Sequence, residues 1–254
     1  MMAGLGPLLR KELLEQWRTL RLPLVAVIFG LIGLSSPLLA RFTAEIIKAV
    51  ASDQFQLNLP PPTVADSVDQ LAKNLNQLGA LIAILIAAGS VAPEKERGTA
   101  ALILVRPVSR AGFLIAKLAA LGVTFAAALA IALAGWWFYT LVLFEALPIG
   151  GVVVAGILDW LFLMAWVTLT FLASTLTRST LAAAGLGVTA LIVVGLLSIA
   201  PPLASWLPIG LVAAARGFAL GSDISEAWKP ILGTVVLIAA SLGLAWLSFR
   251  RQEL

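Results

Sequence analysis

Long apolar runs separated by short polar stretches dominate the sequence. Six of these runs come close to, or exceed, the roughly 20 residues that a helix needs to cross the hydrocarbon core of a membrane. They cover residues 22–40, 75–92, 113–143, 152–176, 181–199 and 231–249. The pattern therefore predicts an all-α integral membrane protein in which residues 1–254 form one membrane domain with six transmembrane helices.

Composition supports this fold class. Hydrophobic residues make up 61% of the 254 residues and the mean hydropathy is +1.03, whereas soluble domains are about 45–50% apolar. Because a water-soluble fold could not hide so much apolar surface, we expect the lipid bilayer to surround most of the chain. The net charge of +4 then belongs to membrane ends rather than to a nucleic-acid-binding surface. No nucleic-acid partner is expected.

Lysine and arginine are unevenly divided between the two sides of the predicted bundle. Of the 17 basic residues, 12 flank the side that carries both termini and the loop between the second and third runs, and 5 flank the other side. Membrane proteins retain an excess of basic residues in the cytoplasm. We therefore predict a multi-pass protein of the cytoplasmic (inner) membrane with both termini in the cytoplasm.

A short amphipathic helix is predicted ahead of the first run. Its apolar stripe consists of Leu9, Leu13, Trp17 and Leu20, at spacings of 4, 4 and 3 residues, which place the four on one helical face. Basic side chains lie off this stripe, as in helices that rest in the membrane interface near anionic headgroups. The alternative is a solvated extension of the first span.

Two segments are expected on the outer side. In residues 41–74, Thr63 followed by Asp66 is a capping-box pattern, which predicts the start of a helix that leads into the second run. Residues 200–230 are rich in proline and glycine, and their apolar stretch at 211–220 is too short to span. Stretches of this length are interfacial or re-entrant, so we expect short re-entrant helices here.

The residue types exclude several chemistries. The chain has no cysteine and no histidine, which excludes disulfides and the usual zinc sites. No lysine follows a glycine, so the phosphate-binding motif G-x-x-x-x-G-K-[ST] is absent, and so is Gly-x-Ser-x-Gly. We therefore predict no catalytic residue, no metal site and no cofactor in this chain, and we do not expect it to be an enzyme.

Asp159 is the only acidic residue inside a predicted span. An acid within the membrane is by default a candidate for a functional polar site. In the alternative that we favour, the fourth span starts near Asp159 and Trp160, which leaves the carboxyl group at the interface. Hydroxyl side chains near the other end of this span, including Ser174 and Thr175, are expected to bond to backbone carbonyls or neighbouring helices.

A charged segment between the second and third runs has a pattern of its own. Residues 94–97, with the sequence Glu-Lys-Glu-Arg, precede an apolar turn or two at residues 100–105. Pro107 ends this short helix, because proline lacks a backbone N–H and restricts the residue before it. Gly98 permits a tight turn into the helix. A short helix under a membrane domain is well placed to receive force from a soluble partner.

The residues of this segment resemble a family motif. The run E-x-E-R-G-T, a leucine-rich turn and then R-P-V-S-R are similar to the coupling-helix loop of ABC transporter permeases of the type-2 exporter family. The resemblance implies a cytoplasmic coupling helix that contacts a separate ABC ATP-binding subunit, on which ATP and Mg would bind. The residues that it places in this contact are Glu94, Glu96, Arg97, Gly98, Thr99, Arg106, Pro107 and Arg110.

The same resemblance implies a function. It predicts the transmembrane permease subunit of an ATP-driven exporter, paired with a second copy of itself or with a similar permease. The interfacial helix, the six spans and the short outer helices occupy the positions that these permeases give them. The alternatives are a channel-like or scaffold membrane protein without an ATPase, and an intramembrane enzyme. The sequence does not indicate the substrate.

Overall fold

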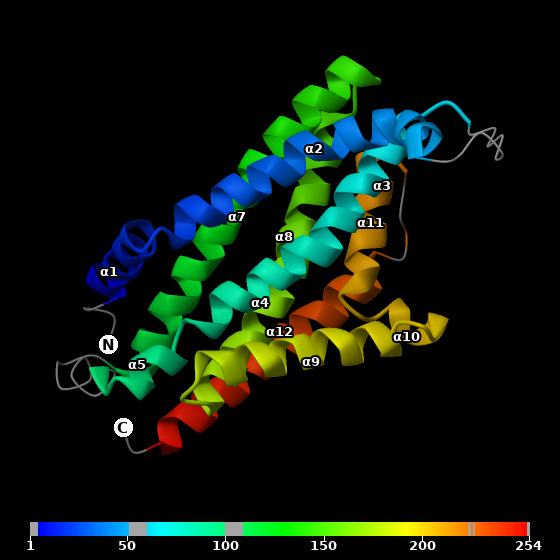
Figure 1. Cartoon of the computed structure of the whole chain (residues 1–254). Coiled ribbons are helices and arrows are strands. Elements are labelled where there is room, and N and C mark those ends of the chain that lie inside the picture. Colours follow the sequence, from blue (N-terminus) through cyan, green and yellow to red (C-terminus); the bar gives the residue numbers. More distant parts are fainter. Residues whose placement is uncertain (1–4, 51–59, 100–108, 223–224, 226, 253–254) are drawn as a thin grey trace.

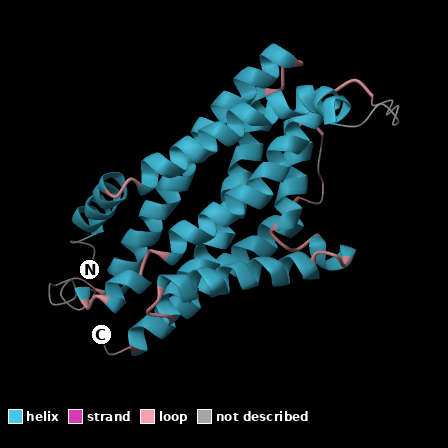
Figure 2. Ribbon diagram, viewed as in Figure 1, coloured by secondary structure: helices cyan, strands magenta, loops and turns pink. Residues whose placement is uncertain are grey.

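The computed structural model describes residues 5–50, 60–99, 109–222, 225 and 227–252. In this part of the chain all regular structure is helical (Figure 2). Six helical segments within it are long and apolar enough to cross a membrane. The predicted class of an all-α integral membrane protein with six spans is therefore confirmed.

The helices form an elongated bundle (Figure 1). The spanning segments are α2, the stretch from α3 through the π-helical turn η1 and α4 to α5, and then α7, α8, α9 and α12. The bounds are α1 Leu5–Arg18, α2 Arg21–Val50, α3 Val64–Asn74, η1 Leu75–Gly79, α4 Ala80–Ala88, α5 Ala92–Glu96, α7 Arg110–Leu143, α8 Ile149–Leu176, α9 Thr180–Leu197, α10 Pro201–Ala204, α11 Ile209–Ala219 and α12 Trp228–Arg251.

The first two spanning segments are longer than the apolar runs that predicted them. Helix α2 continues to Val50 and α3 already begins at Val64, so the predicted polar segment 41–74 is largely helical. Apolar length underestimated α3 because this helix is amphipathic and buries one face, including Val68 and Leu71. The predicted capping box is present, since the Thr63 N–H donates to the Asp66 carboxylate at 2.7 Å.

Helix α8 lies at the centre of the bundle. It packs against α4, α7, α9, α11 and α12, and 61% of its most apolar stretch is buried, compared with 11% for α9 and 17% for α12. On the other side of the core, α2 packs along α7. There the rings of Phe29 and Phe125 meet edge to face with centroids 6.0 Å apart, a favoured aromatic geometry.

The two ends of the bundle carry different elements. The described residues nearest to both termini lie at the same end as α5, which we call the termini end (Figure 1). The start of α3 and the short helices α10 and α11 lie toward the opposite end. Helix α11 packs against α8 and α3 and corresponds to the short helix predicted at residues 211–220. A shared end for both termini follows from an even number of spans.

Candidate functional site

Charged side chains from α1, α5 and α7 meet inside the termini end. Lys117 of α7 is 4% exposed, and its Nζ lies 3.0 Å from a carboxylate oxygen of Glu12 in α1 and 2.7 Å from one of Glu94 in α5. One buried ammonium group therefore joins the N-terminal helix α1 and the end of the second spanning segment, α5, to the third spanning helix, α7. Buried charges of this kind are stable only when they are paired.

A second lysine completes the group. Lys11 Nζ lies 2.9 Å from Glu12, 2.8 Å from Glu15 and 3.6 Å from Glu94. Two ammonium groups therefore form ion pairs with three carboxylates. The Arg21 guanidinium lies beside them and donates to the Gly89 carbonyl at 3.1 Å. The ion cluster below means these residues: Lys11, Glu12, Glu15, Glu94 and Lys117.

Contact between Lys11 and Glu15 shifts the pKa values of both groups. Burial by itself would lower the pKa of Lys11, but its bonds to Glu15 and Glu12 outweigh burial and raise that pKa above 10.5. Burial would raise the pKa of Glu15, but the bond from Lys11 and the charge of Lys117 hold it below 4.5. Both groups are therefore charged across the physiological range.

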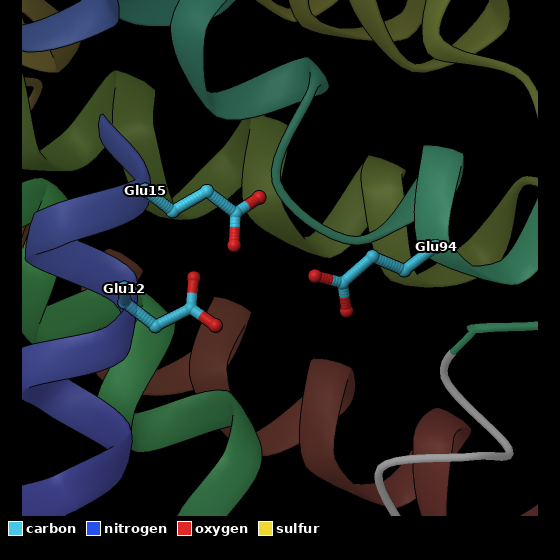
Figure 3. A group of neighbouring side chains, drawn as sticks. All are labelled: Glu12, Glu15 and Glu94. Atoms are coloured by element: carbon cyan, nitrogen blue, oxygen red, sulfur yellow. The ribbon is translucent and has the colours of Figure 1, made fainter. Parts of the chain in front are cut away.

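The three carboxylates also have the geometry of a cation site. One oxygen from each of Glu12, Glu15 and Glu94 lies within 4.8 Å of the others, and the side chains point toward a common space (Figure 3). Lysine ammonium groups already bond to each of the three side chains. We therefore describe the group as a network of ion pairs. One Glu94 oxygen, Oε2, is buried without a hydrogen-bond partner.

Helix α1 presents a polar face to the bundle. Glu12 and Gln16 are buried, and Gln16 accepts a hydrogen bond from the Thr124 hydroxyl of α7. The predicted apolar stripe lies beside this face, with Leu9 and Leu13 half-buried and Trp17 61% exposed. Leu20 does not extend the stripe as predicted, because α1 ends at Arg18 and Leu20 has a φ of 59°.

The residues from Glu94 in α5 to Thr99 divide into an inward group and an outward group. Glu94 points to Lys117 inside the bundle, and the Thr99 hydroxyl donates to the Glu94 carbonyl at 3.2 Å. Glu96, Arg97 and Gly98 are exposed. Gly98 has a φ of +69°, a conformation that glycine adopts without strain, in agreement with the predicted turn. The predicted site residues Arg106 and Pro107 lie outside the described residues.

Arg110 bonds within the chain. Its guanidinium donates to the carbonyls of Phe249, Arg250 and Gln252 at 3.0, 2.9 and 2.8 Å. These carbonyls close the C-terminal end of α12, where a cation also complements the helix dipole. The start of α7 is thereby fastened to the end of α12.

The segment between α4 and α5 is fastened to the end of α8. The Ser174 hydroxyl accepts from the N–H groups of Val91 and Ala92 at 3.1 and 2.9 Å and donates to the Ala88 carbonyl at 2.8 Å. Lys95 donates to the Thr175 carbonyl at 2.7 Å. The expectation that these hydroxyls satisfy backbone groups is confirmed, and together these bonds fix the base from which the charged loop leaves the bundle.

Asp159 lies away from the ion cluster. Helix α8 begins at Ile149, so Asp159 is ten residues inside it, about 15 Å along the axis. The helix therefore begins ten residues before the start that we favoured for the span, and the position of Asp159 relative to the bilayer stays a prediction. The helix continues outward because residues 149–158 are apolar and pack partly on α11 and α7. The carboxyl group is 6% exposed.

Sequence reasoning missed Lys117 and Glu12. Lys117 stands inside the run 113–143, and it is one of the 12 basic residues assigned above to the side of the bundle that carries both termini. A lysine inside a spanning run is itself a signal, since an intramembrane charge requires a partner. That partner could not be located from the sequence, because Glu12 is 105 residues away.

Comparison with known proteins identifies the family. A family model described as ABC-2 family transporter protein matches residues 7–254. The chain belongs to this ABC-2 family. It is also 28% identical to the uncharacterized transmembrane protein YxlG of Bacillus subtilis (strain 168), over 97% of both chains. ABC-2 proteins are membrane subunits of transporters, and the described bundle from residue 7 onward, including the ion cluster, falls within the match.

Proposed function

We propose that this ABC-2 protein is the permease subunit of an ATP-driven exporter and that a separate ATP-binding subunit docks at the termini end. The observation that carries the proposal is the buried bond between Lys117 and Glu94. It connects the loop whose sequence resembles a coupling helix directly to a spanning helix. A force on the loop would therefore reach α7 through an ion pair with little freedom to yield.

The division of the loop supports two roles for its residues. The exposed side chains of Glu96 and Arg97 are free of described contacts within the bundle and would meet the ATP-binding subunit. Glu94 would transmit the displacement inward, to Lys117 and to Glu12 of α1. Gly98 would provide the turn between these parts. ATP and Mg would bind on the partner, since this chain lacks a phosphate-binding lysine motif.

The assembly would contain two permeases and two ATP-binding subunits. One chain supplies six spanning segments, which we take as half of the path. The sparsely covered helices α9 and α12 leave surface for lipid and for a second copy or a similar permease. The 12 to 5 division of basic residues supports placing the termini end in the cytoplasm.

Orientation can be tested with cysteines, because the chain has none. Glu96→Cys and Glu145→Cys place single thiols on exposed positions at the termini end and between α7 and α8. An impermeant thiol reagent applied to intact cells should label Glu145→Cys and spare Glu96→Cys. The opposite labelling pattern would reverse the proposed orientation.

Coupling can be tested by co-purification from native membranes. The wild-type chain should retain an ATP-binding subunit in equal amounts and support transport-linked ATP hydrolysis. Glu96→Lys should reduce both, because it reverses a charge at the proposed contact, while membrane insertion stays normal. Glu145→Lys is the matched control and should behave as wild type. Full transport by the chain without any nucleotide-binding subunit would replace this proposal with the channel-like alternative.

A further inference from the structure

A second buried charge lies in a cavity between α3, α7, α8 and α11. The cavity has room for about one water-sized group, and its walls include Asp159, Leu71, Leu133, Ala155 and Val212. Apart from Asp159 and Arg216 at the edge, the lining is apolar, with the ring of Trp136 as its largest member. In Figure 1, α11 lies alongside α3 and α8 at this level of the bundle.

The Asp159 carboxyl group has no partner among the described residues. It is 6% exposed, and no side chain or backbone N–H in that part of the chain bonds to it. Burial of a carboxylate among apolar side chains is costly unless a cation or donors compensate it. A carboxylate that is buried among apolar side chains and has no partner in the described chain is a candidate site for a cationic ligand.

The nearest arginine is engaged elsewhere. The Arg216 guanidinium forms an ion pair with Asp69 of α3, in which Nε bonds to one carboxylate oxygen and Nη2 lies 3.3 Å from the other. This two-point contact matches the planar fork of arginine. The Asp69–Arg216 pair therefore links α3 to α11 over the cavity and leaves the charge of Asp159 uncompensated.

The residues that line the cavity also restrict the chemical class of cation that would bind there. Hard metal ions take six or more oxygen ligands, and the described lining offers a single carboxylate. An organic ammonium group needs one anionic partner, and its alkyl part gains from apolar walls. The space beside Asp159 holds about one water-sized group, which is close to the size of a primary ammonium group. It therefore suits a compact headgroup whose narrow alkyl chain extends through the mouth.

Helix α11 forms the wall that does not belong to a spanning helix. It does not span the membrane by length, and it lies against α8 at Gly151, where a Cβ would come within 2.1 Å of the Phe218 carbonyl. Only glycine allows this contact. Displacement of α11 would open the cavity without breaking a spanning helix.

We propose that Asp159 and this cavity bind the ammonium group of an amphiphilic alkylamine. A role for this site in transport rests on the proposed function, whereas binding itself requires only this chain. The binding test therefore uses the purified full chain in lipid nanodiscs without an ATP-binding subunit. Failure of binding and failure of ATPase coupling can then be told apart.

The probe is n-octylammonium at pH 7, with n-octanol as the uncharged match and sodium chloride at equal ionic strength. Octylammonium should raise the unfolding midpoint of the wild-type chain, and the other two additives should not. Asp159→Asn should weaken the apparent affinity by about 30-fold or more, as expected for loss of a buried charge partner. Glu145→Gln, which removes an exposed acid, should bind as wild type.

A variant that fills the cavity tests the proposal without changing Asp159. Ala215→Leu keeps Asp159 but fills space on the α11 wall, and it should also weaken octylammonium binding. Each variant must first show cooperative unfolding without additive. Equal shifts for wild type and Asp159→Asn, or an equal shift with sodium chloride, would overturn the proposal.

Discussion

The ion cluster and the Asp159 cavity hold charge inside the same bundle under opposite conditions. In the cluster, Lys117 is surrounded by carboxylates that it bonds to. In the cavity, Asp159 faces apolar walls without a described partner. A compensated charge resists separation and suits transmission of force between helices. A buried carboxylate without a partner in the chain can bind a cationic ligand, so it suits ligand recognition. Removal of each charge should therefore have opposite effects on stability.

Lys117→Met should produce the largest effect. It leaves Glu12 and Glu94 buried with only the half-exposed Lys11 as a partner, and breaking a buried pair from one side costs about 3–5 kcal/mol. We expect a destabilised chain in which α1 separates from α7. Denaturant unfolding in mild detergent measures the loss. Lys73→Met removes an exposed lysine of α3 and should change the unfolding free energy little.

Asp159→Asn should shift stability in the other direction. The substitution keeps the size of the side chain and removes a carboxylate that burial disfavours, so we expect stabilisation of about 1 kcal/mol. The same unfolding measurement applies, with Glu145→Gln as the exposed control. A marked loss of stability would mean that Asp159 is compensated within the bundle, and the comparison between the two charges would fail.

Lowering the pH should weaken the ion cluster by protonating Glu15 of α1. The pKa of Glu15 is held below its ordinary 4.5, so its contribution is present above that value and is lost as pH falls through the lowered pKa. The pKa of Lys11 is raised above 10.5, so its contribution is lost only as pH rises past that value. A fluorophore on Leu14→Cys should keep constant anisotropy between these limits and gain mobility in acid.

A fluorophore at the far end of α7 serves as the control for this measurement. Val142 is 63% exposed and lies away from the cluster, so a fluorophore on Val142→Cys should not respond in the same acid range. Parallel changes at both positions would indicate general unfolding rather than release of α1.

The smallest effect is expected at Gly98. Its φ of +69° costs an alanine about 1 kcal/mol, whereas asparagine tolerates this region better. No atom of the described residues lies within 4 Å of the position a Cβ would take, so the expected effect is conformational rather than steric. Gly98→Ala should weaken ATPase co-purification a few-fold, and Gly98→Asn should weaken it less. Equal behaviour of both variants with wild type would remove the turn from the coupling argument.

The spans were predictable because their signal is local. Apolar length alone located all six spanning segments, and Thr63 with Asp66 marked the start of α3. The family resemblance rested on one loop and agrees with the family match. Segment 41–74 was misjudged because half of an amphipathic helix is polar, and composition does not distinguish it from a loop.

The candidate sites depend on distances that the sequence does not contain. Glu12 and Lys117 pair across 105 residues, and Arg110 reaches carbonyls 139 to 142 residues away. Periodicity identified the apolar stripe of α1 but not that its polar face, with Glu12 and Gln16, would be the buried one. In a soluble protein the apolar face packs inward. Here lipid can accept Trp17, which leaves the polar face for the protein.

The contact of Arg110 with the end of α12 gives that helix an unusual mechanical character. Along its length α12 packs on α8 but leaves most of its apolar stretch uncovered, with 17% of it buried, and its last carbonyls are fixed by one guanidinium. Such a helix would turn as a rigid rod about the end that Arg110 holds. A small rotation where α7 begins would swing the far end of α12, near Trp228 and its edge-to-face neighbour Trp206, through a larger arc. This arrangement would thus amplify motion across the thickness of the bundle.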